Sequence, residues 1–480
     1  MTTNTQESGF EALIVKHLVE QNGYEQGLND DYNREYAIDE TRLFRFLTET
    51  QPKQVLQLGL NDSENKRLAF LNRLTGEIAK RGIIDVLRKG MKIYPANLIM
   101  FYQTPSEKNV AAKALFDKNI FSVTRQLLFA RHDAKLSLDL CLFINGLPVI
   151  TCELKNQLTK QDVEDAVYQY KTDRYPKELL FQFKRCMAHF AVDDAQIKFC
   201  TKLAGNHSWF LPFNKGYNDG AGNPPNPAGI MTDYLWKETF SKRELADIIE
   251  NYAQVVEEKD EDTGKKTEKQ IFPRYHQLAV VKQLLGDVKD KGIGQRYLIQ
   301  HSAGSGKSNS IAWLAHQLVG LEKDGENLLD SVIVVTDRIN LDKQIAATIK
   351  QFMQVSNTVA KAEDSGDLKK FIREGKKIII STIHKFEYVL KDIDVSHKGN
   401  RYAIIIDEAH SSQSGSMSAA MNTVLGGNYD PDEDPEDIII RLMEGRQLLK
   451  NASYFAFTAT PKNKTLEMFG VPDPLPDGTL

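Results

Sequence analysis

Hydrophobic and polar positions follow different patterns in the two halves of the chain. In the second half, short apolar runs rich in β-branched residues alternate with segments of helical periodicity, such as SIAWLAHQLVGL at 310–321. Buried strands separated by helix-length segments are typical of a parallel sheet with helices on both faces. The pattern therefore predicts an α/β domain, with strands at YLIQ (297–300), SVIVVT (331–336), KKIIIST (376–382), YAIIID (402–407) and YFAFTAT (454–460).

The first half begins with an amphipathic helix and later contains a hairpin signal. The predicted helix runs from Phe10 to Gln21, and Asn22-Gly23 ends it. Further along the chain, two apolar runs flank Asn145-Gly146, a dipeptide that favours tight β-hairpin turns. We therefore expect a β-hairpin centred on residues 145–146.

Three polar segments interrupt these patterns. Residues 214–229 are rich in Gly, Asn and Pro and predict a loop, whereas the acidic residues 428–437 predict a surface insertion. Residues 257–269 form a charge run without apolar periodicity, as expected for a solvated loop or linker. Because 480 residues are too many for one core, we place a boundary at this run and predict domains at 1–255 and 256–480.

Composition narrows the class of protein. Hydrophobic residues make up 41% and charged residues 26% of the chain, which excludes a wholly disordered protein. The net charge of −4 argues against histone-like coating of nucleic acid, but it leaves open a local basic groove. No apolar run approaches the roughly 20 residues of a membrane-spanning helix, and the N-terminus lacks a secretory signal. The four cysteines have neither CxxC spacing nor the density of a disulfide scaffold, so we expect a cytoplasmic protein without a membrane partner.

The segment HSAGSGKS at 301–308 is the sharpest motif of the second half, because it lies between a predicted strand and a predicted helix. Its glycines let the backbone turn so that successive N–H groups face phosphate oxygens, and the dipole of the following helix favours negative charge. Lys307 supplies a positive charge to the β- and γ-phosphates, and the Ser308 hydroxyl is a ligand for Mg²⁺. We predict an ATP site formed by Gly304, Ser305, Gly306, Lys307 and Ser308.

A pair of carboxylates ends the predicted strand at 402–407. Asp407, at the carboxyl end of this strand, is placed to bind the Mg²⁺ of the nucleotide, and Glu408 to orient and polarise the attacking water. An acidic pair that merely caps a strand is a reasonable alternative for the motif by itself. Because this pair follows a phosphate-binding segment along the chain, a catalytic role for Asp407 and Glu408 is the better interpretation.

These segments resemble the motifs of superfamily-two helicases. DEAH at 407–410 resembles motif II and Thr458-Ala459-Thr460 resembles motif III, and variants without glycine at the place of His301 are common in that superfamily. The resemblance implies one RecA-like lobe. Further segments that match are VTDRINLDKQ (335–344, motif Ia), STIHKF (381–386, motif Ib) and PRYHQ (273–277, the Q-motif).

The same resemblance has two further implications. Arg274 and Gln277 are expected to contact the nucleotide, because the glutamine of a Q-motif binds adenine, although a polar residue at a helix N-terminus is the simpler alternative for Gln277. Helicases of this class also need a second RecA-like lobe that carries an arginine finger. We expect that lobe to be absent from this chain, and the chain alone to hydrolyse ATP poorly.

The predicted hairpin carries Asp139 on one strand and Glu153 and Lys155 on the other. A two-residue turn would pair Asp139 with Cys152 and leave Glu153 on the opposite face, whereas a three-residue loop would gather the polar groups on one face. We favour the second arrangement, because polar groups scattered over both faces of so apolar a hairpin would be costly to bury. Two carboxylates on adjacent strands suit Mg²⁺, which activates water, and Lys155 can position that water.

The spacing Asp-x13-Glu-x-Lys resembles the PD-(D/E)xK nuclease motif, with Leu138 where proline is usual. The resemblance implies a nuclease domain built on a mixed sheet with flanking helices, with Asp139 and Glu153 as metal ligands. It also implies a catalytic role for Gln169, from a Q-x-x-x-Y element in which Asp173 stands where tyrosine is expected. Such nucleases often use a glutamate of the first helix, but a solvated glutamate is an equal alternative for Glu11.

A nuclease domain followed by a DEAH-type motor resembles the restriction (R, HsdR) subunit of type I restriction–modification enzymes of bacteria and archaea. Segments that carry this resemblance are LFINGLPVITCELKNQ, FPRYHQ, QHSAGSGKS, DEAHSSQSG and FTATPKNKT. It implies ATP-dependent translocation of double-stranded DNA and Mg²⁺-dependent cleavage, with a DNA methyltransferase and a specificity subunit as partners. Two alternatives stay open: a stand-alone helicase–nuclease of repair or phage defence, and an ATP-gated DNA-binding scaffold with a degenerate nuclease site.

Overall fold

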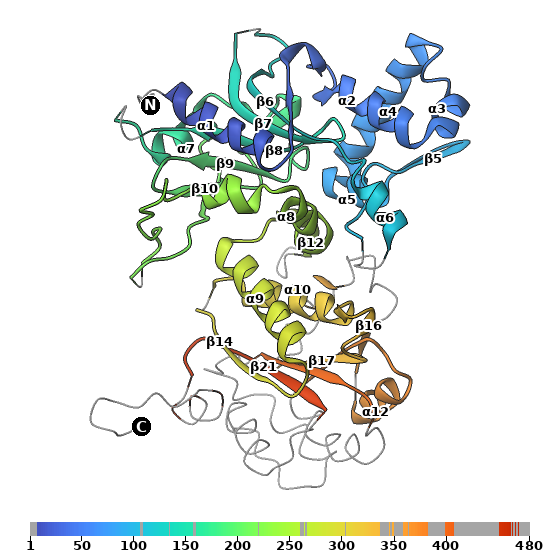
Figure 1. Ribbon diagram of the computed structural model, residues 1–480, viewed down its shortest axis with the longest axis vertical. Helices are drawn as coiled ribbons and strands as arrows, with labels where there is room; N and C mark the ends of the chain where they lie inside the picture. The colour runs from blue at the N-terminus through green and yellow to red at the C-terminus, as the bar shows by residue number, and fades with distance from the viewer. Residues whose placement is uncertain are drawn as a thin grey trace. The chain divides into compact units, whose positions relative to one another are not determined.

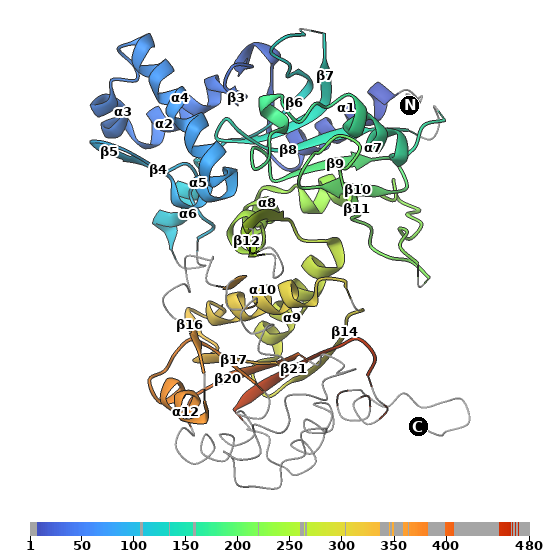
Figure 2. The same cartoon turned by 180° about the vertical axis from the view of Figure 1, so that it is seen from behind.

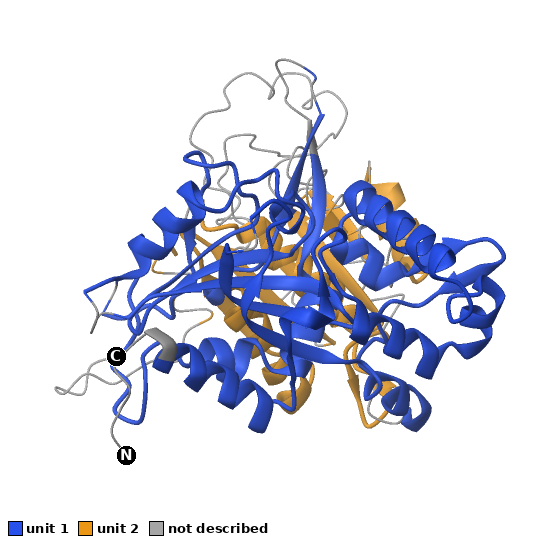
Figure 3. Cartoon of the chain, turned by 90° about the horizontal axis from the view of Figure 1, so that it is seen from above, with its two compact units in different colours: residues 1–276 blue, residues 277–480 orange. Residues whose placement is uncertain are grey.

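The computed structural model describes residues 7–105, 109–133, 135–156, 160–218, 220–259, 264, 266–302, 304–336, 345, 348–349, 359–362, 364–382, 399–407, 451–461, 463, 466 and 469. The chain divides into two compact units, residues 1–276 and residues 277–480 (Figure 3). Within the described ranges, no helix is both long and apolar enough to cross a membrane.

The division between the units comes after residue 276, and not near residue 255 where the charge run suggested it. The run contains parts of two antiparallel strands, β12 (Gln254–Lys259) and β13 (Lys266–Ile271). The Gln270 Nε2 atom donates hydrogen bonds to the carbonyls of Cys186 (2.7 Å) and Met187 (2.9 Å), which ties this hairpin to the first unit. A charged, solvated face on a strand looks like a linker in sequence, which is why the boundary was misplaced.

A mixed seven-stranded sheet forms the centre of the first unit (Figures 1 and 2). Neighbouring strands are parallel in the pairs β1–β6 and β8–β9 and antiparallel in the other four pairs. In spatial order the strands are β1 (Glu25–Gly27), β6 (Phe121–Leu128), β7 (Ser137–Ile144), β8 (Leu147–Leu154), β9 (Ala188–Val192), β10 (Ile197–Cys200) and β11 (Leu211–Pro212).

Two helices pack on this sheet and carry residues of the candidate nuclease site. The helix α1 (Glu7–Glu20), predicted from its periodicity, contacts β6 and β8. The helix α7 (Val163–Thr172) connects β8 to β9 and packs against both. It begins at a capping box in which Asp162 and Asp165 satisfy the first backbone N–H groups, and its apolar side chains at helical spacing are buried on the sheet.

Smaller elements surround the sheet. Between β1 and β6 lie α2 (Glu40–Thr50), α3 (Pro52–Leu58), α4 (Glu64–Arg81), α5 (Ile83–Lys89), α6 (Val110–Phe116), and the two-stranded ribbons β2 (Tyr32–Asn33) with β3 (Ile38–Asp39) and β4 (Met91–Ile93) with β5 (Ala96–Leu98). The helix α8 (Lys242–Asp247) follows the sheet. The described residues of 214–229 form no helix or strand beyond an isolated bridge from Tyr217 to Gly220, as the predicted loop requires.

The turn between β7 and β8 has two residues, Asn145 and Gly146, with φ of 51° and 79°. Asn145 is buried; its Oδ1 accepts the N–H of Ile120 (2.7 Å) and its Nδ2 donates to the carbonyl of Met100 (2.9 Å). A Cβ atom at position 146 would lie 2.3 Å from the Asp39 carbonyl oxygen, so only glycine fits there. The tip of the hairpin is therefore clamped into the unit.

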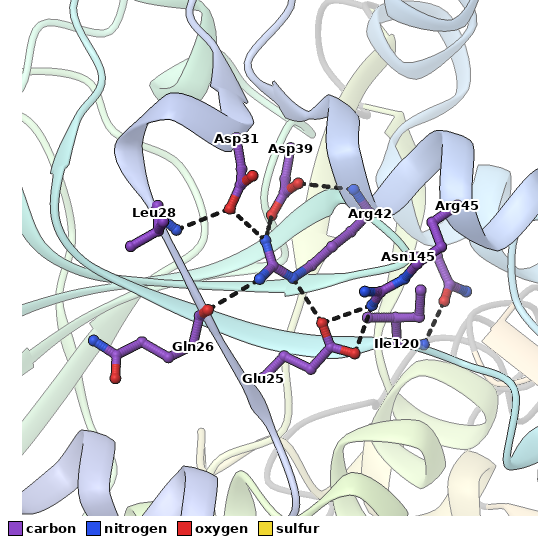
Figure 4. A network of polar contacts seen from close by, with 9 residues as sticks. All are labelled: Glu25, Gln26, Leu28, Asp31, Asp39, Arg42, Arg45, Ile120 and Asn145. Atoms are coloured by element: carbon purple, nitrogen blue, oxygen red, sulfur yellow. Dashed lines mark hydrogen bonds and ion pairs between the residues drawn. The ribbon is translucent and has the colours of Figure 1, made fainter.

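An arginine network holds the segment that clamps this turn (Figure 4). The Arg42 guanidinium bonds to Asp39 (2.8 Å), Asp31 (2.9 Å) and Glu25 (3.1 Å), and the Asp39 N–H donates to the Gly146 carbonyl (2.9 Å). Arg42 is buried, and its three carboxylate partners compensate for its lost hydration. The network thus links β1, α2 and the hairpin turn.

The second unit contains the parallel sheet that the apolar runs predict. Its six strands are, in spatial order, β14 (Arg296–Gln300), β21 (Ala452–Thr458), β20 (Tyr402–Asp407), β17 (Ser331–Thr336), β19 (Ile378–Thr382) and β18 (Val359–Lys361), and every neighbouring pair is parallel. The remaining elements are α9 (Tyr275–Lys291), α10 (Lys307–Val319), α12 (Ser365–Arg373), and a ribbon of β15 (Glu322–Lys323) and β16 (Glu326–Asn327). The acidic insertion at 428–437 lies outside the described residues.

Candidate active sites

The register of the β7–β8 hairpin places Asp139 and Glu153 on one face of the sheet. Phe143 pairs with Pro148 but Leu142 pairs with Ile150, so Val149 is an extra residue in β8. Beyond this bulge Leu140 pairs with Cys152, and the next position along brings Asp139 opposite Glu153. The three-residue loop expected from the sequence is wrong, since the turn has two residues, but the bulge supplies the missing residue and gathers the polar groups as expected.

Asp139 is held at both carboxylate oxygens. The Leu154 N–H donates to Oδ2 (2.8 Å), and the Gln126 amide Nε2 donates to Oδ1 (3.1 Å). These contacts come from strands on either side of β7, so Asp139 sits in the middle of three adjacent strands.

Glu153 is fully buried and has one strong partner. The Nε atom of Arg174, just after α7, lies 2.5 Å from its Oε1, while Oε2 has no hydrogen-bond partner among the described residues. Burial and the neighbouring charge of Asp139 raise the pKa of Glu153 to about 8, although Arg174 and Lys155 act in the opposite direction. Glu153 in turn raises the pKa of Arg174 against the effect of burial.

Lys155 follows β8, two residues after Glu153, and is 7% exposed. Its backbone N–H donates to the Val192 carbonyl (2.8 Å), which extends the β8–β9 pairing past the end of the strand. Residues two apart on a strand share a face, and the charge of Lys155 lowers the pKa of Glu153. The structure therefore brings together the three residues Asp139, Glu153 and Lys155 that the sequence singles out.

Gln169 lies half-buried on α7, and its side chain makes no hydrogen bond to a residue that the structure describes. The two nearby tyrosines differ in their surroundings. The Tyr170 hydroxyl is buried against Thr151 Oγ1 (2.9 Å), and Tyr175 is exposed. The side chain that reaches Glu153 from this region is Arg174.

Glu11 is buried and is not the solvated glutamate of the simpler interpretation. Its Oε1 accepts from Arg125 Nε (2.8 Å) and its Oε2 from Gln126 Nε2 (3.1 Å). Because Gln126 also binds Asp139, Glu11 belongs to the same polar cluster. Sequence reasoning missed Arg125, Gln126 and Arg174, because each lies far from its partner along the chain and none forms part of a short motif.

The donor set fits a hard divalent cation such as Mg²⁺. Asp139 and Glu153 supply carboxylate oxygens, and Glu153 Oε2 is a buried acceptor without a hydrogen-bond partner among the described residues. Within the described residues, no group of three or more His, Cys, Asp or Glu side chains is arranged around a common metal position. A cation bound here would therefore be held by two carboxylates together with other oxygen ligands.

The phosphate loop joins β14 to α10 as predicted. Gly304 and Gly306 have φ of 74° and 88°, in the left-handed region that glycine tolerates, and α10 begins at Lys307. His301 donates its backbone N–H to the Thr458 carbonyl (2.7 Å), so the loop is connected to β21. The ring of His301 also contacts Ser305 Oγ and, at 3.3 Å, Ser310 Oγ, which braces the loop where the full motif would have glycine.

Lys307 and Asp407 meet at the carboxyl edge of the parallel sheet. Lys307 Nζ lies 2.7 Å from Asp407 Oδ1, and Asp407 is buried at the end of β20. Ser308 follows Lys307 in the first turn of α10, and the role of its hydroxyl as an Mg²⁺ ligand stays a prediction. Glu408 lies outside the described residues, as do 337–344 and 383–386 of the predicted motifs.

Gln277 binds the phosphate loop directly. Its Nε2 atom donates to the carbonyls of Gly306 (2.9 Å) and Ser305 (3.2 Å), and the residue is 3% exposed. Gln277 therefore supports the loop from α9, and its predicted contact with adenine stays a prediction. The same holds for the nucleotide contact of Arg274, whose pKa is lowered by burial.

Each of the two candidate sites lies in a region that matches a known protein family. Residues 4–208 match the family model of the type I restriction enzyme R protein N terminus, and residues 276–430 match that of the SWI2/SNF2 ATPase. The first match and the curated relatives below relate this chain to the R proteins of type I restriction enzymes. The first matched region contains Asp139 and Glu153 of the mixed sheet. The second contains Lys307, which begins α10 beside the parallel sheet.

Curated relatives extend the match over most of the chain. The putative type I restriction enzyme MjaVIIIP endonuclease subunit of Methanocaldococcus jannaschii is 24% identical over 95% of this chain and 40% of its own length. The type I restriction enzyme HindI endonuclease subunit of Haemophilus influenzae is 25% identical over 80% of this chain and 36% of its own length. This chain therefore spans well under half the length of those relatives.

Solved helicase structures show a weak likeness. The Hef helicase domain of Pyrococcus furiosus has a TM-score of 0.28 at 17% identity, covering 42% of this chain and 37% of that one. At such a score the likeness adds nothing to the assignment. The helicase-type fold of the second unit rests on the ATPase family match and on the parallel sheet itself.

Proposed function

We propose that this chain supplies the nuclease site and the first motor lobe of a type I restriction enzyme. In that enzyme, ATP-driven translocation of double-stranded DNA would be coupled to Mg²⁺-dependent cleavage of unmodified DNA. The observation that carries the proposal is the pairing of Asp139 with Glu153 across the bulged hairpin, beside Lys155, in the region that matches the R protein family. Its partners would be DNA, a methyltransferase and a specificity subunit.

In the proposed nuclease site, neighbouring side chains and backbone groups hold the two carboxylates in place. Asp139 and Glu153 would hold Mg²⁺, which when bound supplies an activated water and neutralises charge on the phosphodiester. Arg174 keeps the buried Glu153 carboxylate oriented through its Oε1, leaving Oε2 for a ligand. Lys155 would position the water or the scissile phosphate from the same face of β8. Gln169, on α7, would act at the edge of this site.

In the motor site, the loop and the sheet edge together fit the phosphates of Mg-ATP. Backbone N–H groups around Gly304 and Gly306 would bind phosphate oxygens, and Lys307 would exchange its contact with Asp407 for the β- and γ-phosphates. Ser308 and Asp407 would hold the Mg²⁺ that accompanies ATP. Glu408, next along the chain from Asp407, would orient the attacking water.

The test uses the complete complex with its methyltransferase and specificity subunits. We expect Asp139→Ala and Lys155→Ala to abolish DNA cleavage while ATP hydrolysis and translocation continue, because the two sites lie on different units. Lys113→Ala, at an exposed lysine of α6 in the same unit, is the control and should cleave normally. Cleavage that persists in both site variants would show that the nuclease site lies elsewhere, and a wild-type complex without metal-dependent cleavage would favour the scaffold.

A further inference from the structure

Gln126 has a backbone conformation that residues other than glycine rarely adopt. Its φ is +45°, although it lies within β6, where Arg125 pairs with Leu140 and Leu127 with Leu138. Such a conformation persists only where surrounding contacts hold it, and it often occurs where a side chain must be aimed. The contacts of Gln126 show where its side chain is aimed.

The left-handed conformation brings two consecutive side chains to the same carboxylate. In a regular strand, neighbouring residues point to opposite faces of the sheet. Here Arg125 Nε binds Glu11 Oε1 (2.8 Å), and Gln126 Nε2 binds Glu11 Oε2 (3.1 Å). Gln126 has therefore been turned toward the polar cluster of α1 and β7.

Three hydrogen bonds fix the amide of Gln126. The Ser137 hydroxyl donates to its Oε1 (2.8 Å), and the opposite end of the amide faces two carboxylates, which only accept, so that end is the donor. The Nε2 atom then donates to Glu11 Oε2 and to Asp139 Oδ1, at 3.1 Å in each case. One amide group thus lies between two carboxylates that would otherwise repel each other.

We propose that Gln126 is a positioning residue of the nuclease site, which fixes the direction of the Asp139 carboxylate and joins it to Glu11 of α1. With the Leu154 N–H on Oδ2, Gln126 on Oδ1 leaves Asp139 no freedom to rotate. Preorganised ligands bind a cation more tightly than mobile ones, and loss of a residue that orients a metal ligand typically weakens metal binding about 10- to 100-fold. The inference rests on the proposed function, because it needs Asp139 to be a metal ligand.

Two substitutions separate the hydrogen bonds of Gln126 from its backbone conformation. Gln126→Met keeps the length of the side chain without a donor. Gln126→Asn keeps the amide and tolerates the left-handed conformation, but is one methylene too short to reach both carboxylates. The matched control is Gln182→Met, at an exposed glutamine whose Nε2 donates to the Lys177 carbonyl (3.1 Å).

The readouts are Mg²⁺ binding to the 480-residue chain by calorimetry and the Mg²⁺ dependence of DNA cleavage by the complete complex. In both Gln126 variants we expect the dissociation constant and the half-saturating Mg²⁺ concentration to rise about tenfold or more. The cleavage rate at saturating Mg²⁺ should stay within a few-fold of wild type, and the unfolding temperature of Gln126→Asn should be unchanged. A merely structural role would instead lower the unfolding temperature and leave Mg²⁺ binding by the folded protein unaltered.

A double-mutant cycle tests whether Gln126 acts through the cluster. Glu11→Gln and Gln126→Met should weaken Mg²⁺ binding by less in combination than the product of their separate effects, because they disrupt one network. If Asp139→Ala leaves cleavage intact, the proposed nuclease site itself fails. If Asp139→Ala abolishes cleavage and Mg²⁺ binding while Gln126→Met matches wild type in both, the inference about Gln126 alone is overturned.

Discussion

Among the residues of the proposed nuclease site, Glu153 is a fully buried carboxylate. A carboxylate without solvent is stable only when it is protonated, paired or bound to a cation. Burial and Asp139 raise the pKa of Glu153 to about 8, and Arg174 at 2.5 Å is the partner that limits this rise. Arg174 therefore determines how readily Glu153 is charged.

Arg174→Ala should destabilise the first unit in a pH-dependent way. The folded pKa of Glu153 lies above its unfolded value, so its ionisation opposes folding, and this cost grows as pH rises through about 8. Without Arg174 we expect a loss of about 3–5 kcal/mol at pH 9, and a clearly smaller loss at pH 5, where Glu153 is protonated. Urea unfolding at the two pH values measures this, with exposed Arg243→Ala as the control. Equal losses at both pH values would contradict the role of Arg174 as counter-ion.

At the scale of elements, β8 and β9 are joined beneath α7 by a chain of buried hydrogen bonds. His189 of β9 has its Nδ1 2.7 Å from Thr151 Oγ1 of β8, which in turn lies 2.9 Å from the Tyr170 hydroxyl of α7. Burial lowers the pKa of His189 to about 3, so the ring is neutral in the folded protein. Glu153 lies on β8, Gln169 lies on α7, and Arg174 follows α7 along the chain. The packing of these elements therefore sets the geometry of the site.

His189 should make the first unit less stable in acid. Below about pH 6.5 the unfolded chain binds a proton at His189 that the folded protein does not accept until about pH 3, so stability falls as pH decreases through this window. Between pH 7 and pH 5 this one group should account for about 2 kcal/mol. His189→Gln should remove that part of the decline in urea unfolding, whereas His207→Gln, at an exposed histidine, should not. An unchanged pH dependence in His189→Gln would show that the ring takes up a proton in the folded state.

At the scale of the whole molecule, the two proposed sites lie on separate compact units, and each is built by a sheet of its own. The mixed sheet assembles Asp139 and Glu153 from neighbouring strands. The parallel sheet brings the phosphate loop and Asp407 to its carboxyl edge, where loops between strands and helices meet. The two sets of site residues have no member in common.

Lys307→Ala should stop the motor and leave the nuclease site intact. Loss of one charged contact to a transition state typically costs on the order of 100-fold or more in rate, so ATP hydrolysis and translocation by the complete complex should fall by at least that factor. Cleavage far from the recognition site should be lost with translocation, while Mg²⁺ binding to the first unit stays at the wild-type level. The control is Lys291→Ala, whose lysine pairs with Asp287 on α9. Wild-type translocation in Lys307→Ala would remove the motor assignment.

The sequence by itself determined the features that depend on neighbouring residues. Apolar runs predicted the strands of the parallel sheet, helical periodicity predicted α1 and α10, and Asn145-Gly146 predicted the hairpin turn. The glycines and Lys307 identified the phosphate loop, because its chemistry lies within eight consecutive residues. The choice of Asp139, Glu153 and Lys155 followed from their spacing and from the resemblance to a nuclease motif.

Only the tertiary structure decided how distant residues meet. The bulge at Val149 set the register of Asp139 against Glu153, and the register depends on how β7 and β8 pair over their whole length. Glu11 binds Arg125 across 114 residues, so its burial depends on how α1 packs against β6. The unit boundary also depended on packing, because a charged hairpin that Gln270 ties to the first unit has the composition of a linker. Local propensity acts over a few residues, whereas burial and long-range hydrogen bonds are properties of the folded chain.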